Sequence, residues 1–121
     1  MASRSEPGDP RPQLANRDGS AVVSGVRCTA CSLPVAFSRP RCPACHGEVV
    51  PAQFGPTGVV WSATVVRIAT PGREPPYALA YVDLDDGPRV LAHLSGDHAP
   101  DVGTRVRLAA ASHRDLRVEV L

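Results

Sequence analysis

The sequence predicts an all-β protein of two parts, a small metal-bound module followed by a barrel of five strands. Two pairs of cysteines lie in the first half of the chain, and the second half has the two-residue period of strands with turn residues at short intervals. With 121 residues, the chain has room for only a small hydrophobic core beside the module. We therefore expect a metal or a partner surface to contribute to its stability.

The start of the chain and the overall charge limit the possible classes of protein. Residues 1–20 are expected to form a disordered tail, because they contain three prolines, two glycines and almost no large apolar side chain. No apolar segment follows Met1 and no stretch is long enough to span a bilayer, so we expect a cytoplasmic protein without membrane contact. The thirteen basic residues, all arginine, are balanced by twelve acidic residues, which argues against strong attraction to nucleic acid.

Residues 21–57 are expected to form a rubredoxin-like zinc ribbon with its flanking segments. Cys28 and Cys31 form one Cys-x-x-Cys pair, Cys42 and Cys45 form the second, and ten residues separate the pairs. Each pair makes a tight turn that directs two sulfurs to one point, and four thiolates complete a tetrahedral shell. Because a closed shell leaves no position for water or substrate, we expect one structural zinc ion. Iron remains an alternative, since it also accepts four sulfurs in a tetrahedron.

Other interpretations of this segment are less favoured. Two disulfides would not persist in a reducing compartment. A thioredoxin-like redox pair occurs once, in a βαβ context, whereas here the motif occurs twice without helical surroundings. His46 follows Cys45 directly, but four thiolates already complete the shell. His46 is therefore expected to be exposed or to donate a hydrogen bond within its turn.

Residues 58–121 are expected to form a five-stranded OB-fold barrel. Three prolines make the segment 71–76 a loop, and Asp85-Asp86-Gly87 marks a hairpin in which Gly87 supplies the positive φ. A three-strand meander followed by two further strands is the OB-fold pattern. The expected strands, rich in β-branched and alternating apolar residues, cover 59–68, 77–84, 89–94, 104–109 and 116–120.

The order of these features resembles the acyl-CoA-associated zinc-ribbon/OB-fold family. The resemblance covers about residues 26–121 and is carried by the two cysteine pairs and by the segments 58–66, 75–84 and 102–106. It implies a noncatalytic accessory subunit that binds and stabilises a thiolase-like enzyme, or one of ketosynthase, aldolase or hydratase type, acting on acyl-CoA thioesters. The resemblance places such enzymes in lipid, steroid side-chain or polyketide metabolism. It also implies a hetero-oligomer such as a heterotetramer, with acyl-CoA at the shared interface and the catalytic cysteine in the partner.

The residues themselves argue against catalysis by this chain alone. All four cysteines are assigned to the metal, so no thiolate nucleophile remains. Ser95 lacks the Gly-x-Ser-x-Gly elbow of a hydrolase. His93 is expected to be a packed or hydrogen-bonded barrel residue, and His98 and His113 are expected to be solvated in turns.

Candidate contacts with CoA or with the partner lie in both modules. Arg67, Arg73 and Arg89 flank the proline-rich loop and could bind phosphate bidentately, although solvated positions are the simpler interpretation. Leu33 and Phe37 in the ribbon hairpin are candidate partner contacts. A free-standing acyl-CoA carrier would need a complete pocket within a small core, which makes it less favoured.

A nucleic-acid-binding protein is the alternative function, because zinc ribbons and OB-folds both occur in that class. Residues 58–121 contain seven arginines against eight acidic residues, so no strongly positive groove is predicted. We expect two of the three barrel aromatics, Trp61, Tyr77 and Tyr81, to lie in the core, which would leave few stacking platforms. Both observations favour the accessory subunit.

Overall fold

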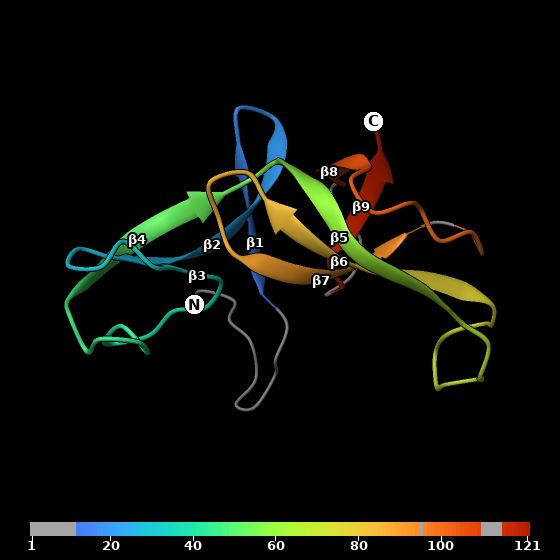
Figure 1. The fold of residues 1–121 in the computed structure, drawn as a ribbon, viewed down its shortest axis with the longest axis horizontal. Helices are drawn as coiled ribbons and strands as arrows, with labels where there is room; N and C mark the ends of the chain where they lie inside the picture. The colour runs from blue at the N-terminus through green and yellow to red at the C-terminus, as the bar shows by residue number, and fades with distance from the viewer. Residues whose placement is uncertain (1–11, 95, 110–114) are drawn as a thin grey trace.

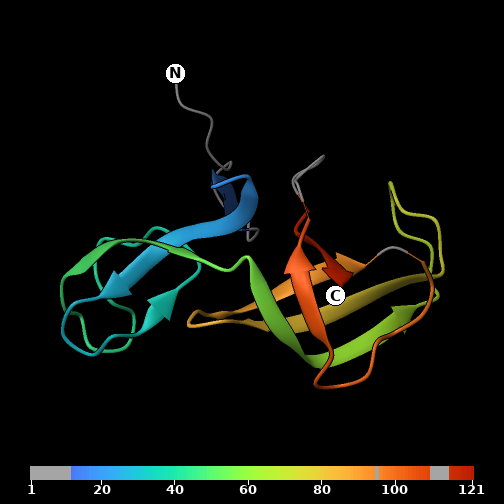
Figure 2. The same ribbon diagram turned by 90° about the horizontal axis from the view of Figure 1, so that it is seen from above.

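In the computed structural model, which describes residues 12–94, 96–109 and 115–121, two β-sheets lie side by side (Figures 1 and 2). The all-β prediction is confirmed, and none of the described residues forms a helix long and apolar enough to cross a bilayer. The strands are β1 (Gln13–Arg17), β2 (Ser20–Cys28), β3 (Pro34–Val35), β4 (Val49–Phe54), β5 (Thr57–Val66), β6 (Tyr77–Leu84), β7 (Arg89–Leu94), β8 (Arg105–Leu108) and β9 (Arg117–Val120).

The first sheet is built around β2. Its edges pair antiparallel with β1 and β3 on one side and with β4 on the other. Gly25 lies near the centre of β2, where the end of β3 passes so closely that a Cβ would meet the Val35 carbonyl oxygen at 2.0 Å. Only glycine fits this approach. The ribbon can therefore fold back over β2 without a gap.

The expectation of a disordered tail up to residue 20 is wrong for its last part. Gln13–Arg17 form β1, which pairs with β2 through a two-residue turn at Asp18 and Gly19. Both turn residues have positive φ, 52° and 81°, as a tight hairpin of this kind requires. The Asp-Gly dipeptide between two strands was the signal for this hairpin. Residues 1–11 lie outside the described residues.

The second sheet is a closed barrel with the strand order β5-β6-β7-β9-β8. β7 and β9 pair in parallel, and every other neighbouring pair is antiparallel. This meander of three strands, joined to a further pair that closes back on β5, is the OB-fold order, so the predicted architecture is confirmed. The expected strands at Tyr77–Leu84 and Arg89–Leu94 match β6 and β7 at both ends.

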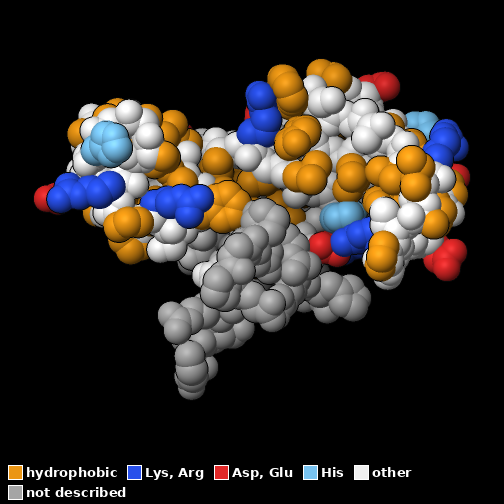
Figure 3. Space-filling model, turned by 90° about the horizontal axis from the view of Figure 1, so that it is seen from below, with side chains coloured by type: hydrophobic (Ala, Val, Ile, Leu, Met, Phe, Trp, Pro, Cys, Tyr) orange, Lys and Arg blue, Asp and Glu red, His pale blue; other side chains and the backbone are white. Residues whose placement is uncertain are grey.

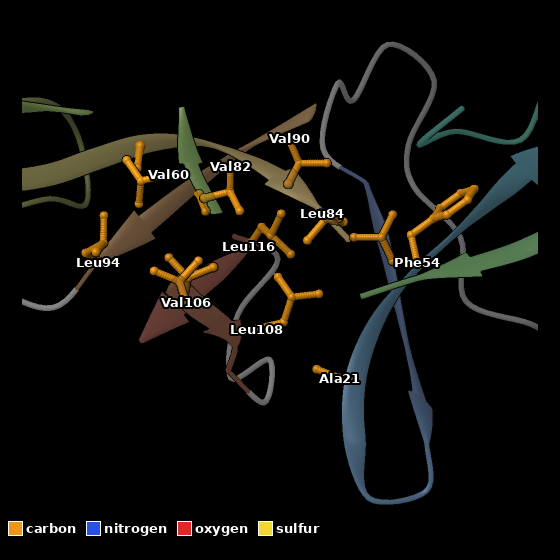
Figure 4. Packing of buried hydrophobic residues seen from close by; sticks show 14 of the residues in the cluster. Ala21, Phe54, Val60, Val82, Leu84, Val90, Leu94, Val106, Leu108 and Leu116 are labelled. Carbon is orange, nitrogen blue, oxygen red and sulfur yellow. The ribbon is translucent and has the colours of Figure 1, made fainter. Parts of the chain in front are cut away.

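One core joins the two sheets. Phe54 is only 3% exposed and ends β4 against the end of the barrel, beside Leu84 (Figure 4). Phe54 completes β4 and Thr57 begins β5, so only Gly55 and Pro56 separate the strands. From the ribbon sheet, the core includes Ala21, Val23, Ala36 and Phe54; from the barrel it includes Val60, Ala78, Ala80, Val82, Leu84, Val90, Ala92, Leu94, Val106, Leu108, Leu116 and Val118.

The turn between β6 and β7 differs from the prediction in which residue has positive φ. Asp86, with φ of 57°, occupies the left-handed region, and Gly87 does not. Aspartate tolerates this region better than most residues. Gly87 is needed for space instead, because a Cβ there would meet the Phe54 Cβ at 2.8 Å. The turn is thus fitted against the ribbon sheet.

Arg27 on β2 makes a second link between the sheets. Its guanidinium donates to the carbonyl oxygen of Ser32 at 2.9 Å and to that of Asp86 at 2.6 Å. The same group lies 5.4 Å from the centre of the Phe54 ring. One side chain therefore connects the first cysteine turn to the β6–β7 turn of the barrel.

The aromatic residues are placed differently from the prediction. Trp61 is 49% exposed and Tyr81 is 46% exposed, so neither lies in the core. A bulge between Val60 and Ser62 explains the position of Trp61: Val60 is buried opposite Val82, and the extra residue lies on the outer surface. Tyr81 lies between the buried Ala80 and Val82, so the ordinary alternation of β6 turns it outward. The argument that few stacking platforms are available is therefore wrong.

Candidate functional site

The four predicted ligands come together at the far end of the ribbon sheet from the barrel. Their sulfurs all lie within 4.8 Å of one another. The Sγ atoms of Cys28 and Cys45 are 3.5 Å apart, and those of Cys31 and Cys42 are 3.7 Å apart. Two loops, each beginning at a buried cysteine and carrying an exposed one three residues later, thus supply two sulfurs each.

The two cysteine turns have the same backbone hydrogen bonds. Cys28 N–H donates to the Leu33 carbonyl at 3.0 Å, and Cys42 N–H donates to that of Gly47 at 3.0 Å. Each turn is closed by an N–H four residues after its first cysteine, at Ser32 and His46, which both have positive φ. The exposed His46 is therefore a turn residue, as expected from the complete shell. The left-handed conformation of Ser32 and His46 had no signal in the sequence, since neither residue is Gly, Asn or Asp.

Backbone N–H groups aim at the sulfurs of the buried cysteines. The pKa of Cys28 is lowered to about 6, chiefly by the N–H of Cys31 and also by that of Ala30, against the opposing effect of burial. At Cys45 a hydrogen bond at Gly47 lowers the pKa, but the neighbouring sulfurs of Cys28 and Cys31 raise it overall to about 12. Crowded thiols of this kind share protons until a cation replaces them.

This geometry fits a four-coordinate metal. At a Zn–S distance of about 2.3 Å, the sulfurs of a regular tetrahedron lie about 3.8 Å apart, close to the two separations described above. The donor set consists of thiolates alone, which suits zinc and, in the same geometry, iron. Cys28, Cys31, Cys42 and Cys45 would together hold one ion and leave no open position. Such a metal would fix the two loops and would not contact a substrate.

The structure does not bring the candidate arginines together. Arg73 lies beside His93 near the end of β7, whereas Arg89 begins the same strand four residues earlier, on the order of 13 Å away. Arg67 is exposed just after β5. Each of these two guanidiniums instead has a carboxylate of its own, Asp115 for Arg73 and Asp83 for Arg89.

Arg73 belongs to a small cluster on the barrel surface. It forms an ion pair with Asp115, and its guanidinium lies 3.4 Å from Nδ1 of His93 and 5.8 Å from the Tyr77 ring centre. His93 Nε2 is 3.9 Å from Asp115. Burial, followed by the charge of Arg73, lowers the pKa of His93, so this imidazole is neutral at pH 7. His93 is thus a packed and hydrogen-bonded barrel residue, as its sequence position predicts.

Arg89 is held in place by two neighbours. Its Nε and Nη2 atoms donate to both carboxylate oxygens of Asp83, at 2.7 and 3.1 Å, and its Cζ lies 3.7 Å from the centre of the Trp61 ring. The ion pair lowers the pKa of Asp83 through the hydrogen bond from Arg89. The guanidinium is therefore charge-paired and stacked, which leaves little of its charge for an external anion.

The remaining candidates lie at separate places. Phe37 is half-buried and packs against the common core, while Leu33 is half-buried beside the first cysteine turn, where its carbonyl accepts from Cys28. His98 is exposed, as predicted, and directly follows the bend at residues 96–97. Ser95 and His113 lie outside the described residues.

Comparisons with known proteins agree with this architecture. Residues 52–111 match the family described as "ChsH2, C-terminal OB-fold domain". Benzoylsuccinyl-CoA thiolase subunit BbsA of Thauera aromatica is 34% identical over 86 residues, which make up 68% of this chain and 58% of that protein. The BbsA subunit of Geobacter metallireducens is 34% identical over 82 residues, 65% of this chain and 54% of that protein.

A solved structure extends the match over both modules. The "Ltp2-ChsH2(DUF35) aldolase" aligns with a TM-score of 0.61 and 29% identity over 80% of this chain and 81% of that chain. A match of this length is longer than the barrel alone, so it includes residues of the ribbon sheet. The chain spans a little over half the length of the two BbsA subunits. It belongs to the acyl-CoA-associated zinc-ribbon/OB-fold family that the order of its motifs resembles.

Proposed function

We propose that the chain is a noncatalytic accessory subunit that binds and stabilises a thiolase-like enzyme acting on acyl-CoA thioesters. The observation that carries the proposal is the likeness, over both modules, to a protein solved as an Ltp2-ChsH2(DUF35) aldolase, together with the likeness to a thiolase subunit. The catalytic partner would be of thiolase, ketosynthase, aldolase or hydratase type. Lipid, steroid side-chain or polyketide metabolism in the cytoplasm is the proposed context.

The chemistry of the described residues supports an accessory role. A thiolase-type reaction needs a free thiolate beside a base, and all four cysteines lie in the metal cluster. His93 is neutral and could accept a proton. Its side-chain contacts among the described residues include Arg73, Asp115 and Tyr77, and none of these three is placed to act as an acyl-accepting nucleophile. The chain would thus contribute surface and rigidity to the complex, and the partner would contribute the reacting groups.

Acyl-CoA at a shared interface remains part of the proposal. Arg73 and Arg89 are each paired with a carboxylate, so CoA phosphates would have to compete with Asp115 or Asp83. Arg67 is exposed and lies at the end of the barrel that also carries the proline-rich loop. If CoA reaches this chain, we therefore expect Arg67 to contribute more than Arg89.

Nucleic-acid binding is the second candidate, because Trp61 and Tyr81 lie half-exposed on barrel strands where bases could stack. Their charge environment argues against it. Arg89 is neutralised by Asp83, and Arg105 donates to both carboxylate oxygens of Asp85. A positively charged groove that follows the phosphate backbone of a nucleic acid would need these arginines to be free of carboxylate partners.

The test is to co-express the chain with thiolase-like reading frames of its native host and to analyse the products by size-exclusion chromatography and native mass spectrometry. We expect a stable hetero-oligomer, such as a heterotetramer, with one zinc per chain, and an acyl-CoA cleavage activity that falls when the chain is omitted. A partner that is equally stable and active alone would contradict the proposal. Recovery of nucleic acid without an enzyme would favour the second candidate.

A further inference from the structure

Three large side chains form a half-exposed row across three neighbouring barrel strands. Trp61 on β5, Tyr81 on β6 and Leu91 on β7 are 49%, 46% and 45% exposed. The Trp61 and Tyr81 rings meet edge to face with centroids 6.2 Å apart, and Tyr81 lies directly opposite Leu91 in the strand register. On the face seen from below, hydrophobic side chains gather over the barrel half of the molecule (Figure 3). The row is thus one continuous patch.

The patch continues into a groove between the two modules. A cavity of about 310 Å³ is lined mainly by apolar groups, with Phe37 of the ribbon on one side and Leu91, Val90 and Leu116 of the barrel on the other. Leu91 and Arg89 line the groove and also border the aromatic row. We call the surface formed by Trp61, Tyr81, Leu91, Arg89 and Phe37 the Trp61 face.

The Trp61 face is ordered in advance of any contact. Arg89 stacks on Trp61 and is fixed by the two hydrogen bonds that it donates to the Asp83 carboxylate oxygens, so the two long side chains have little freedom left to lose. The guanidinium and carboxylate charges also cancel within the face. Preordered aromatic and arginine side chains around an apolar centre are typical of the residues that dominate protein–protein binding energy.

The charge and size of the face decide between possible occupants. Because its arginine is paired, it offers no unpaired positive group to a phosphate, which disfavours nucleic acid and CoA phosphates. The groove is at the small end of the range for small-molecule sites, which suits one or two apolar side chains of a protein. Since it is walled by both modules, a partner seated there would also fix the ribbon against the barrel.

We propose that the Trp61 face is the docking surface for the thiolase-like subunit, which presents an uncharged apolar patch and inserts an apolar side chain between Phe37 and Leu91. This inference rests on the proposed function and goes beyond it by assigning the contact. It makes Trp61, Tyr81 and Leu91 contact residues, a role that the sequence patterns did not suggest for any of them.

The test uses the purified chain and the purified thiolase-like subunit that co-assembles with it. Trp61 is the only tryptophan, so the chain labelled with 5-fluorotryptophan gives a single fluorine resonance from the centre of the face. We expect this resonance to shift on addition of the partner. Trp61→Ala and Leu91→Glu should each weaken binding by roughly tenfold or more, because they remove or charge a central contact.

Ile68→Glu is the matched control, because Ile68 is 76% exposed in the loop beyond β5 and lies outside the face. This variant should bind like the wild type, and circular dichroism checks that all three variants fold. Equal binding by all variants would overturn the docking surface while leaving the accessory function intact. Absence of binding by the wild type would instead overturn the proposed function and the docking surface together.

Two further outcomes would reassign the face. If the wild type forms dimers on its own and Leu91→Glu makes it monomeric without affecting the partner, the face joins two copies of the chain. If a single-stranded oligonucleotide quenches Trp61 and competes with the partner in a salt-dependent manner, the face is a stacking platform. Either result would overturn the docking of a thiolase-like subunit at this surface.

Discussion

The two ends of the molecule keep their strands together in different ways. Between residues 28 and 48 only Cys28, Ala36 and Cys42 are buried, whereas the described part of the barrel buries twelve apolar side chains. We therefore expect the cysteine end to depend on bonds to a metal, whereas the barrel depends on removing apolar surface from water. A chain of this size can therefore fold two modules with one small core, because the second module would be stabilised by a metal ion.

Removal of the metal should have the largest effect and should act on one end alone. Cys28→Ser, Cys45→Ser or a strong chelator removes a binding free energy that is about 10 kcal/mol or more in small zinc modules. Hydrogen exchange read by mass spectrometry should show the amides of residues 28–48 losing protection while β6 and β7 keep theirs. Ala44→Ser, an exposed change in the same loop, is the control and should retain the metal. Loss of barrel protection at the same time would mean that the two ends fold as one unit.

A core substitution in the barrel should give the reverse pattern. Leu84→Ala removes a side chain that is only 4% exposed, which costs about 2–5 kcal/mol in cores of this kind. Leu91→Ala on the neighbouring strand is the control, because Leu91 is half-exposed, and its effect should stay within about 0.5 kcal/mol. Denaturant unfolding measures both values. If Leu84→Ala released zinc at low denaturant, the independence of the cysteine end would be contradicted.

The contact between the two ends can be tested at Gly87. Gly87→Ala places a Cβ 2.8 Å from the Phe54 Cβ and should cost about 1–3 kcal/mol, since that atom is attached directly to the backbone of β4. In a Phe54→Ala background the same change should cost less, because the contacts with the two ring carbons at 3.0 Å are gone and only the contact with Cβ remains. A double-mutant cycle measures this difference. Equal costs in both backgrounds would show that the Phe54 ring does not pack against the β6–β7 turn in solution.

The smallest effect is expected where a surface ion pair joins the ends of barrel strands. Hydrogen bonds from Arg105 and then Thr57 lower the pKa of Asp85 from 3.8 to about 2. Because the folded pKa lies below the unfolded one, the ionised carboxylate stabilises the fold above pH 4, and this stabilisation is lost as the pH falls through about 2. Both partners are about half-exposed, so Asp85→Asn should cost under about 1 kcal/mol at pH 7.

Thermal unfolding of the wild type and of Asp85→Asn across this range tests the sign. The difference in Tm between them should be largest at neutral pH and should shrink between pH 4 and pH 2. A difference that stays constant over that range would show that the carboxylate charge does not act at this site. In that case the barrel would close through its backbone pairing alone.

The regular parts of the fold could be predicted because local sequence determines them. The cysteine spacing, the alternation along β6 and β7 and the proline-rich loop each follow from a few neighbouring residues. The parts that were missed depend on contacts between distant residues or on a single irregularity. Trp61 is exposed because of a bulge after Val60, and Gly87 is needed because Phe54 from another strand lies against it.

The candidate site shows the same division. The four cysteines converge because their spacing fixes two local turns, whereas the three arginines were grouped only by nearness in sequence. Arg73 and Arg89 turned out to be paired with Asp115 and Asp83, which alternation along a strand does not reveal. The β1 hairpin is a different case, since its Asp-Gly signal was present and was outweighed by the prolines before it.

The unequal burial of the four cysteines gives the metal cluster an inner and an outer side. Cys28 and Cys42 are buried and receive backbone N–H groups, while Cys31 and Cys45 are exposed. A chelator, an oxidant or a metal-delivery protein can therefore reach the cluster only through Cys31 and Cys45. Exchange of the ion should begin with the outer pair and leave a two-coordinate intermediate on the inner one. The lifetime of the module in a cell would then be set by how well those two sulfurs are shielded.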